Sequence, residues 1–431
     1  MALTLRVWVV AGLGVAACDG GPNFAVDATT SSDAHVDGVV GDVAVRGDSP
    51  TNDPHINAVD AISACTSACL APRACVAGAC NPAWLAISSR ASPSRRTNPG
   101  VAIGNGGFLV WGGDGSEGVV GDGARYDAAD GAWRSVSGQN APSPRTDHVV
   151  VWAGDFVFVW GGRNSEGPLD DGALYTPRTD TWTSINSAFA PSPRAGAIAV
   201  WTGAAVLVWG GIGATGLLDD GARYDPARDV WTPMQRTAAP AGRARTAAYA
   251  WTGQALLVWG GSSTGGLSND GGLYDPVLDT WVPVHSEGAP SPRSNMAFAW
   301  GDRALYVWGG YGASLALLND GARYDPQRGV WSPMTTIRAP APRGDVGGVW
   351  TGREFLVWGG AQLVRRAALE ITRLDTGGAY DPARDVWRSL EGLGAPSARA
   401  HHALGWMGAE MFVWGGEGPL GLLGTGARLQ P

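Results

Sequence analysis

Cysteine is the residue type whose placement most clearly implies chemistry in this 431-residue sequence. Four of the five cysteines lie in the short run CTSACLAPRACVAGAC, and thiols this close together form disulfides or hold a metal ion. The run contains no histidine, and its gaps of three, five and four residues match no common zinc motif, so two disulfides are favoured over a zinc knuckle. Three disulfide connectivities remain open. The four residues are Cys65, Cys69, Cys75 and Cys80.

The fifth cysteine, Cys18, ends an apolar run that begins at Val7, directly after Arg6. The run is too short to span a bilayer and has the form of a secretory signal peptide. Its final Val-Ala-Ala-Cys resembles the lipobox of bacterial lipoproteins, which implies that Cys18 becomes the acylated first residue of the mature chain. The alternative is an ordinary signal peptide followed by an unmodified cysteine.

Catalytic and metal-binding residue types are scattered elsewhere. Six histidines are too dispersed for a metal cluster, and the adjacent His401 and His402 would point to opposite faces of a strand. We therefore expect neither a metal nor a cofactor. Acidic pairs before glycine suggest calcium, but turn capping explains them better because a dense alternation of ligands is missing. These pairs are Asp170/Asp171, Asp219/Asp220, Asn269/Asp270 and Asn319/Asp320.

A recurring arginine precedes several apolar strands, often within the sequence PSPR. We expect it to pair with the aspartates of these acidic pairs and to act as scaffold, because it is copied from unit to unit. The arginines are Arg145, Arg194, Arg293, Arg343 and Arg399.

Two tryptophan series show that the chain is built from repeats of about 50 residues. Each series has seven members. The first, in VWGG, is Trp111, Trp160, Trp209, Trp259, Trp308, Trp358 and Trp414. The second is Trp84, Trp133, Trp182, Trp231, Trp281, Trp331 and Trp387.

Each repeat can be laid out as four strands. Two apolar runs separated by a residue and a glycine, as at Thr202-Gly203, predict a tight hairpin. The second run, such as AAVLVW, is apolar on both faces and is typical of a strand buried on both sides. The segment GARYDPARDVW predicts a second hairpin that places Tyr224 opposite Trp231.

The double glycine, the tyrosine and the tryptophan together resemble the kelch repeat, over Trp84 to Pro431. The resemblance implies an all-β, seven-bladed kelch-type β-propeller with four antiparallel strands per blade. The family's R-x-x-H survives only at Arg145…His148 and Arg399…His402. Kelch-like copper oxidases resembling galactose oxidase need a tyrosine cross-linked to cysteine, but no cysteine follows Cys80, and no sialidase Asp-box occurs.

The last repeat lacks its fourth strand, and WLAI, which begins at Trp84, is a fourth strand without the other three. The N-terminal strand should therefore complete the last blade and close the ring. The segment before the cysteine cluster contains eight aspartates and no hydrophobic period, which predicts a disordered acidic tether. The expected domains are residues 1–17 as a signal peptide, 18–64 as a lipid-anchored tether, 65–82 as a disulfide cluster and 83–431 as the propeller.

The long connections, between the second and third strands and between blades, should emerge on one face, the long-loop face. One connection carries seven extra residues, and the spacing of Leu363, Ala367, Ile371 and Leu374 predicts a short helix or ordered flap there. Candidate binding residues are Arg365, Arg366, Glu370 and Arg373 in this insert, together with Arg163 and Tyr311 after other double glycines.

These features favour a non-catalytic binding platform, a monomer in the bacterial cell envelope (periplasmic, outer-membrane or surface) that contacts the membrane only through its lipid. The partner would be a protein or a polysaccharide, and the net charge of −8 argues against nucleic acid. The alternative is a carbohydrate-active enzyme with an acid pair such as Glu370 with Asp114 or Glu417. A cluster of carboxylates, or of tyrosine and arginine, at the channel mouth would separate these possibilities, since its absence would leave only the binder.

Overall fold

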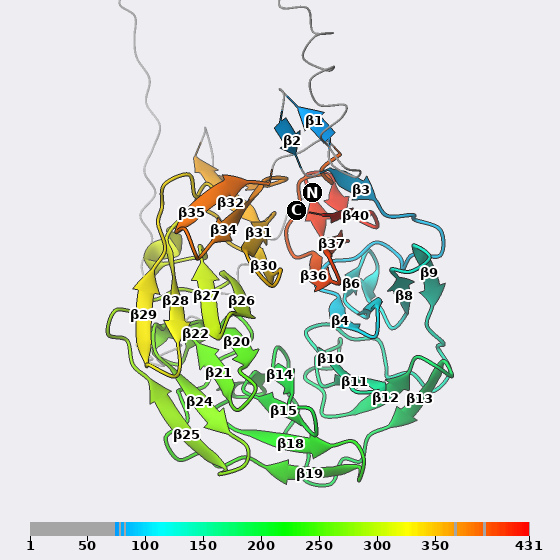
Figure 1. The fold of residues 1–431 in the computed structure, drawn as a ribbon. Coiled ribbons are helices and arrows are strands. Elements are labelled where there is room, and N and C mark those ends of the chain that lie inside the picture. The colour runs from blue at the N-terminus through cyan, green and yellow to red at the C-terminus, as the bar shows by residue number, and fades with distance from the viewer. Residues whose placement is uncertain (1–73, 77–78, 82, 366–368, 391–393, 431) are drawn as a thin grey trace, which may run out of the picture.

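Seven four-stranded antiparallel sheets are arranged as a wheel in this computed structural model (Figure 1), which confirms the all-β, seven-bladed propeller. The structure describes residues 74–76, 79–81, 83–365, 369–390 and 394–430. The signal peptide, the tether, Cys18, Cys65, Cys69 and Arg366 lie outside these residues. No helix in the described ranges is long and apolar enough to cross a membrane.

The strands of each blade follow one another from the channel outward. Blade 1 contains β4 (Gly100–Gly104), β5 (Gly107–Trp111), β8 (Gly123–Asp127) and β9 (Ala132–Ser135). Blade 2 contains β10 (Val149–Ala153), β11 (Phe156–Trp160), β12 (Gly172–Thr176) and β13 (Thr181–Ser184). Blade 3 contains β14 (Ile198–Trp201), β15 (Val206–Trp209), β18 (Gly221–Asp225) and β19 (Val230–Pro233). Blade 4 contains β20 (Ala248–Trp251), β21 (Leu256–Trp259), β24 (Gly271–Asp275) and β25 (Thr280–Val284).

The remaining three blades repeat this plan. Blade 5 contains β26 (Ala297–Gly301), β27 (Ala304–Trp308), β28 (Gly321–Asp325) and β29 (Val330–Pro333). Blade 6 contains β30 (Gly347–Trp350), β31 (Phe355–Trp358), β34 (Gly377–Asp381) and β35 (Val386–Ser389). Blade 7 contains β36 (Ala403–Met407), β37 (Glu410–Trp414), β40 (Gly426–Leu429) and β3 (Trp84–Ala86).

The N-terminal strand closes the ring, as expected. Strand β3 pairs antiparallel with β40, with Trp84 opposite Leu429, and is therefore the fourth strand of blade 7. Strands β36 and β4 then pack together where blade 7 meets blade 1. The inner strand of each blade consequently packs against the inner strands of both neighbouring blades.

The hydrophobic core lies between the blades, because the second strand of each blade is buried on both faces. Tyr224 and Trp231 are opposite each other in register, with ring centroids 5.0 Å apart, as predicted. Trp231 also packs against Trp160 of the preceding blade, at 5.4 Å. The two tryptophan series therefore meet at the blade junctions and supply large apolar contacts there.

The connection between the second and third strands forms a small hairpin in most blades, and these hairpins lie beside the inter-blade segments. The insert is the longest of them, with β32 (Ala361–Arg365) paired to β33 (Leu369–Arg373), so the predicted helix is wrong and the ordered flap is a β-hairpin. Leu363 and Ile371 are direct cross-strand partners, so the helical spacing arose from two strands read as one segment.

The shorter hairpins are β6–β7 (Asp114–Gly115, Gly118–Val119), β16–β17 (Ile212–Gly213, Gly216–Leu217), β22–β23 (Ser262–Ser263, Gly266–Leu267) and β38–β39 (Glu417–Gly418, Gly421–Leu422). Blade 5 has the 3-10 turn η1 (Ala313–Leu315) in this connection.

The recurring arginine joins neighbouring blades. The backbone N–H of Arg145 donates to Val120 of blade 1, and its carbonyl accepts from Gly113 of the same blade. Its fully buried guanidinium donates to Gly161 and Asp171 of blade 2. The predicted pairing with the acidic pairs is confirmed for Arg145 with Asp171, Arg194 with Asp220 and Arg293 with Asp320. Asp270 pairs instead with Arg243, an arginine that was not predicted.

The arginine set is larger than the sequence suggested, because Arg96 and Arg243 occupy the same position in blades 1 and 4. In blades 6 and 7 the carboxylate is replaced by the hydroxyls of Thr376 and Thr425. Burial lowers the pKa of Arg399 to about 10.

A second inter-blade contact uses the aspartate at the end of the turn between the third and fourth strands, which we call the Asp–Trp lock. In blade 4, Asp279 accepts from the Tyr274 hydroxyl and from the backbone N–H of Gln235 in blade 3. The Trp281 indole N–H donates to the carbonyl of the same Gln235 at 3.0 Å. One residue of the preceding blade is thus held at both its N–H and its carbonyl.

Candidate functional site

The mouth of the central channel is framed by residues in the left-handed region of backbone space, two positions after the recurring arginine. Their φ angles lie between 50° and 62°, a conformation that asparagine, aspartate and glycine adopt most readily. The residues, which we call the collar, are Asn98, Asp147, Gly196, Asn295, Asp345 and His401.

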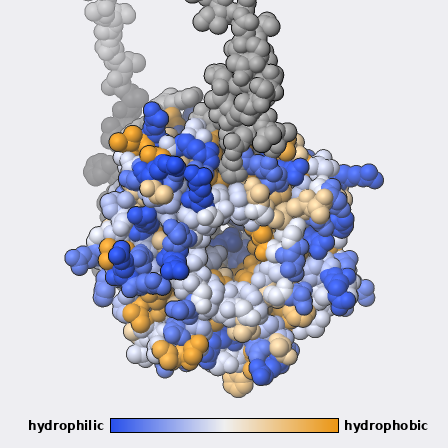
Figure 2. Space-filling model, viewed as in Figure 1, coloured by the Kyte–Doolittle hydropathy of each residue, from blue (hydrophilic) through white to orange (hydrophobic). Residues whose placement is uncertain are grey.

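Backbone hydrogen bonds connect the collar from blade to blade. The N–H of Gly196 donates to Asp147 at 2.6 Å, and the N–H of Asp345 donates to Asn295 at 3.1 Å. The N–H of Asn98 donates to His401 at 3.2 Å, across the junction where the ring closes. Because the backbone is fixed in this way, the collar side chains are held around the hollow that Figure 2 shows at the centre of the wheel.

One cluster of collar charges, the Asp147 cluster, lies on blades 2 to 4. Arg163 Nε lies 2.8 Å from Asp147 Oδ2, and Arg245 Nη2 lies 3.1 Å from Asp147 Oδ1. Burial alone would raise the pKa of Asp147, but the two guanidinium groups lower it below its ordinary value. The cluster therefore has two cations and one anion at neutral pH.

The other cluster, the Asp345 cluster, lies on blades 5 to 7. Asp345 accepts hydrogen bonds from Asn295 Nδ2 at 2.6 Å and from the Tyr311 hydroxyl at 2.8 Å, and His401 Nε2 lies 3.4 Å from it. Burial would raise the pKa of Asp345, but these partners, His401 first, lower it. Burial would lower the pKa of His401, but the hydrogen bond and the charge of Asp345, helped by Glu417, raise it.

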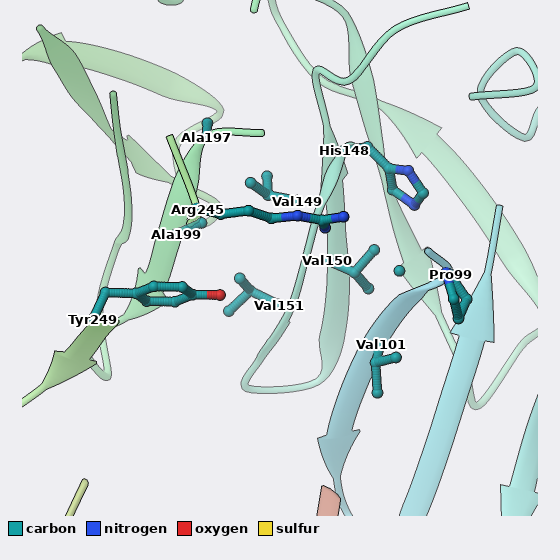
Figure 3. Close-up of a pocket in the computed structure, with 11 residues that line it drawn as sticks. Pro99, Val101, His148, Val149, Val150, Val151, Ala197, Ala199, Arg245 and Tyr249 are labelled. Carbon is teal, nitrogen blue, oxygen red and sulfur yellow. The ribbon is translucent and has the colours of Figure 1, made fainter. Parts of the chain in front are cut away.

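A pocket of about 170 Å³ opens inside the channel next to the Asp147 cluster. In Figure 3 the side chain of Arg245 extends from blade 4 past Ala197 and Ala199 toward Val150, and the hydroxyl of Tyr249 points toward Val151. The two alanines leave room for the long side chains of the next blade. The lining also includes valines of blades 1 and 2 and the ring of His148, and most of its accessible surface is polar.

Arg245 and Tyr249 both have hydrogen-bond donors that no described residue accepts. Within the described part of the chain, the Tyr249 hydroxyl has no partner, and Arg245 uses only Nη2, toward Asp147. Burial raises the pKa of the Tyr249 hydroxyl, and nearby Arg245 opposes this shift, so the hydroxyl stays protonated at neutral pH. The pocket therefore presents N–H and O–H donors beside a cationic cluster and suits an anionic group.

The structure places three of the predicted binding residues at the channel mouth. Arg163 pairs with Asp147, Tyr311 donates to Asp345, and Arg373 lies 2.8 Å from Glu417. Glu370 is exposed on β33, opposite Val364, and Arg365 ends β32 opposite Leu369. Whether these residues bind a partner remains a prediction.

The carboxylates considered for an acid pair have other partners. Asp114 accepts from the Thr146 hydroxyl at 2.9 Å and from Asn98 at 3.3 Å, and Glu417 pairs with Arg373. Among the described residues, no group of three or more histidine, cysteine, aspartate or glutamate side chains is arranged to hold a metal ion.

Sequence reasoning missed Asp147, Asn295, Asp345, Arg245 and Tyr249. The first three share a signal that was available, an asparagine or aspartate at a constant offset of two from the recurring arginine. Arg245 and Tyr249 interrupt the repeat in blade 4, so only their position in the closed ring shows that they meet.

Seven four-stranded sheets around a channel, joined by buried arginines and double glycines, define a kelch-type β-propeller. Two overlapping segments, residues 81–238 and 199–416, match the family model of the KLHDC2/KLHL20/DRC7 Kelch-repeats domain. Together they span most of the chain, which therefore belongs to the kelch-repeat family. No curated protein gives a significant match to the sequence.

Proposed function

We propose that this kelch propeller is a non-catalytic, monomeric binding platform that holds a protein or polysaccharide partner on its long-loop face. Kelch propellers commonly serve as protein-interaction scaffolds and are typically non-catalytic. The observation that carries the proposal is the set of unused donors on Arg245 and Tyr249, which line the channel pocket. An anionic group of the partner would enter there, next to two guanidinium groups.

The proposal predicts which substitutions weaken binding. Arg245→Gln should weaken binding of the captured partner about tenfold or more, since a hydrogen bond to a charged group contributes about 1.5–3 kcal/mol. Tyr249→Phe should weaken it less, and both effects should shrink as salt is added. The measurement is a titration of the detergent-purified chain against the protein or glycan recovered by pull-down or glycan array.

Arg228→Gln is the matched control, because Arg228 is an exposed arginine in the turn between β18 and β19, at the other ends of the strands. It should bind like the wild type. Equal binding by all four proteins, each with an unchanged melting temperature, would contradict the channel-mouth site.

Anchoring at the bacterial envelope is the second part of the proposal, and it depends on the signal peptide and the lipobox. Cys18→Ala should move the protein from the membrane to the soluble fraction, because the acyl chains would contribute about 0.8 kcal/mol per buried CH₂. Fractionation followed by immunoblotting measures this shift. A variant that stays on the membrane would contradict lipidation.

A carbohydrate-active enzyme is the second candidate, because the channel mouth does contain clustered carboxylates with tyrosine and arginine. The lowered pKa values of Asp147 and Asp345 make both groups anionic at neutral pH, whereas a glycosidase acid needs a raised pKa. His401 is the remaining proton carrier of the Asp345 cluster. Turnover of an envelope glycan that disappears in His401→Ala would favour the enzyme.

A further inference from the structure

We propose that Cys75 and Cys80 form a disulfide across the hairpin that precedes the propeller. This hairpin consists of β1 (Ala74–Val76) and β2 (Ala79–Asn81), and in its antiparallel register Cys75 lies directly opposite Cys80. The inference needs the oxidising compartment of the proposed function but not its partner.

The register satisfies the main geometric requirement of a disulfide. Directly opposed residues of an antiparallel pair have Cα atoms about 4.5 or 5.5 Å apart, depending on the type of pair. Disulfides span about 4.4–6.8 Å between Cα atoms, so both types of pair are compatible with a bridge. Of the three connectivities that four cysteines allow, only one joins Cys75 to Cys80, and it leaves Cys65 and Cys69 to each other.

The bond would form by thiol–disulfide exchange with a protein or small-molecule disulfide of that compartment. One cysteine thiol loses its proton, and the resulting thiolate attacks the donor disulfide and releases one donor thiolate. The second cysteine then attacks the mixed disulfide and releases the other. The two cysteines lose two electrons and two protons in total, and the donor disulfide gains them as two thiols.

The bridge would stabilise a hairpin that is too small to be stable alone. Each strand has three residues, and an isolated two-stranded hairpin is marginal in water. Two residues separate β2 from β3, the strand that closes the ring, and Figure 1 shows the hairpin next to β3. A fixed hairpin at this point would define where the preceding segment joins the wheel.

The positions of the arginines allow tryptic digestion to distinguish the proposed disulfide pairing from the other two connectivities. The chain has no lysine, and Arg73 is the only arginine between Arg46 and Arg90, so trypsin produces the peptides 47–73 and 74–90. The first contains Cys65 and Cys69, and the second contains Cys75 and Cys80. The proposal predicts that peptide 74–90 from the secreted chain, alkylated at low pH before digestion, carries an internal disulfide and is linked to no other peptide.

Three mass-spectrometric results would overturn the proposal: peptides 47–73 and 74–90 joined by disulfides, peptide 74–90 joined to the peptide that contains Cys18, or Cys75 and Cys80 alkylated both in the secreted chain and after oxidative refolding. A sample refolded with oxidised glutathione tests whether Cys75 pairs with Cys80 independently of whether the chain is secreted. If only that sample contains the internal bridge, the pairing is correct and the proposed compartment is wrong. Cys75→Ser is the matched variant, and in it Cys80 should become fully alkylated.

Discussion

Two histidines pack where the repeat usually has an apolar residue, and the double glycine makes room for them. His148 and His402 lie edge-on against Trp111 and Trp358, with ring centroids 5.2 and 5.4 Å apart. A Cβ added at Gly359 would lie 2.7 Å from the ring of His402, closer than real Cβ contacts allow. Burial first, and then the neighbouring arginine, lowers the pKa of both histidines to about 3.

The lowered pKa values predict that acid destabilises the fold through these two residues. Above pH 6.5 both histidines are neutral whether the chain is folded or unfolded. Below pH 6.5 the unfolded chain binds protons that the folded chain excludes, so the free energy of unfolding falls by about 1.4 kcal/mol per pH unit for each histidine, until pH about 3. Urea unfolding between pH 7 and 5 measures this slope.

Replacing both histidines by methionine, the residue at the equivalent position of blade 5, should flatten the slope over that range. The carboxylates titrate in both proteins and cancel in the comparison. The same slope with and without the histidines would contradict their burial as neutral rings.

At the scale of strands and turns, three blade junctions lack the Asp–Trp lock. In blade 7 the sequence has Pro82 at the position of the aspartate, and the buried indole N–H of Trp84 has no partner in the described structure. Gly131 and Gly329 replace the turn aspartate in blades 1 and 5, and in these blades the buried indole N–H groups of Trp133 and Trp331 have no partner in the described structure. An unsatisfied buried donor costs about 1–3 kcal/mol. The junctions of blade 7 with blade 1, of blade 4 with blade 5 and of blade 6 with blade 7 should therefore be the weakest of the wheel.

Gly329→Asp should restore the lock. The φ of Gly329 is 67°, near the 54° of the lock aspartate Asp279, and an added Cβ meets nothing within 4 Å. We expect the free energy of unfolding to rise by about 0.5–1.5 kcal/mol, measured by denaturant titration. Asp279→Gly is the matched control and should lower it by a similar amount; a neutral result for both would mean that the lock does not stabilise the junction.

The features that every repeat shares could be predicted from the sequence. The structure of the insert could not, because it depends on which strands pair in the folded chain. Tyr224 opposite Trp231 followed from turn chemistry, and the closing role of Trp84 followed from counting strands. The insert failed because Leu363 and Ile371 satisfy a helical period and also lie across a hairpin, so spacing alone cannot separate the two structures. A third tryptophan series at the ends of the inner strands also went unused, namely Trp152, Trp201, Trp251, Trp300, Trp350 and Trp406.

At the scale of the whole molecule, the ring depends on three residues from one end of the propeller. Deleting residues 83–89 would expose the edge of β40, and we expect a lower melting temperature or aggregation. Deleting residues 19–64 should cause neither, because that segment is expected to be a tether. Differential scanning fluorimetry and light scattering provide the measurements, and equal behaviour of the two deletions would contradict closure by β3.

The closing strand also sets an order of events during synthesis. Strand β3 leaves the ribosome before every other strand of the wheel, but its partner β40 is the last strand to be made. Blades 1 to 6 contain only consecutive strands, so each can form as soon as its own segment has emerged. Blade 7 cannot be completed until β40 has been made, and until then the first strand of the wheel remains without a partner.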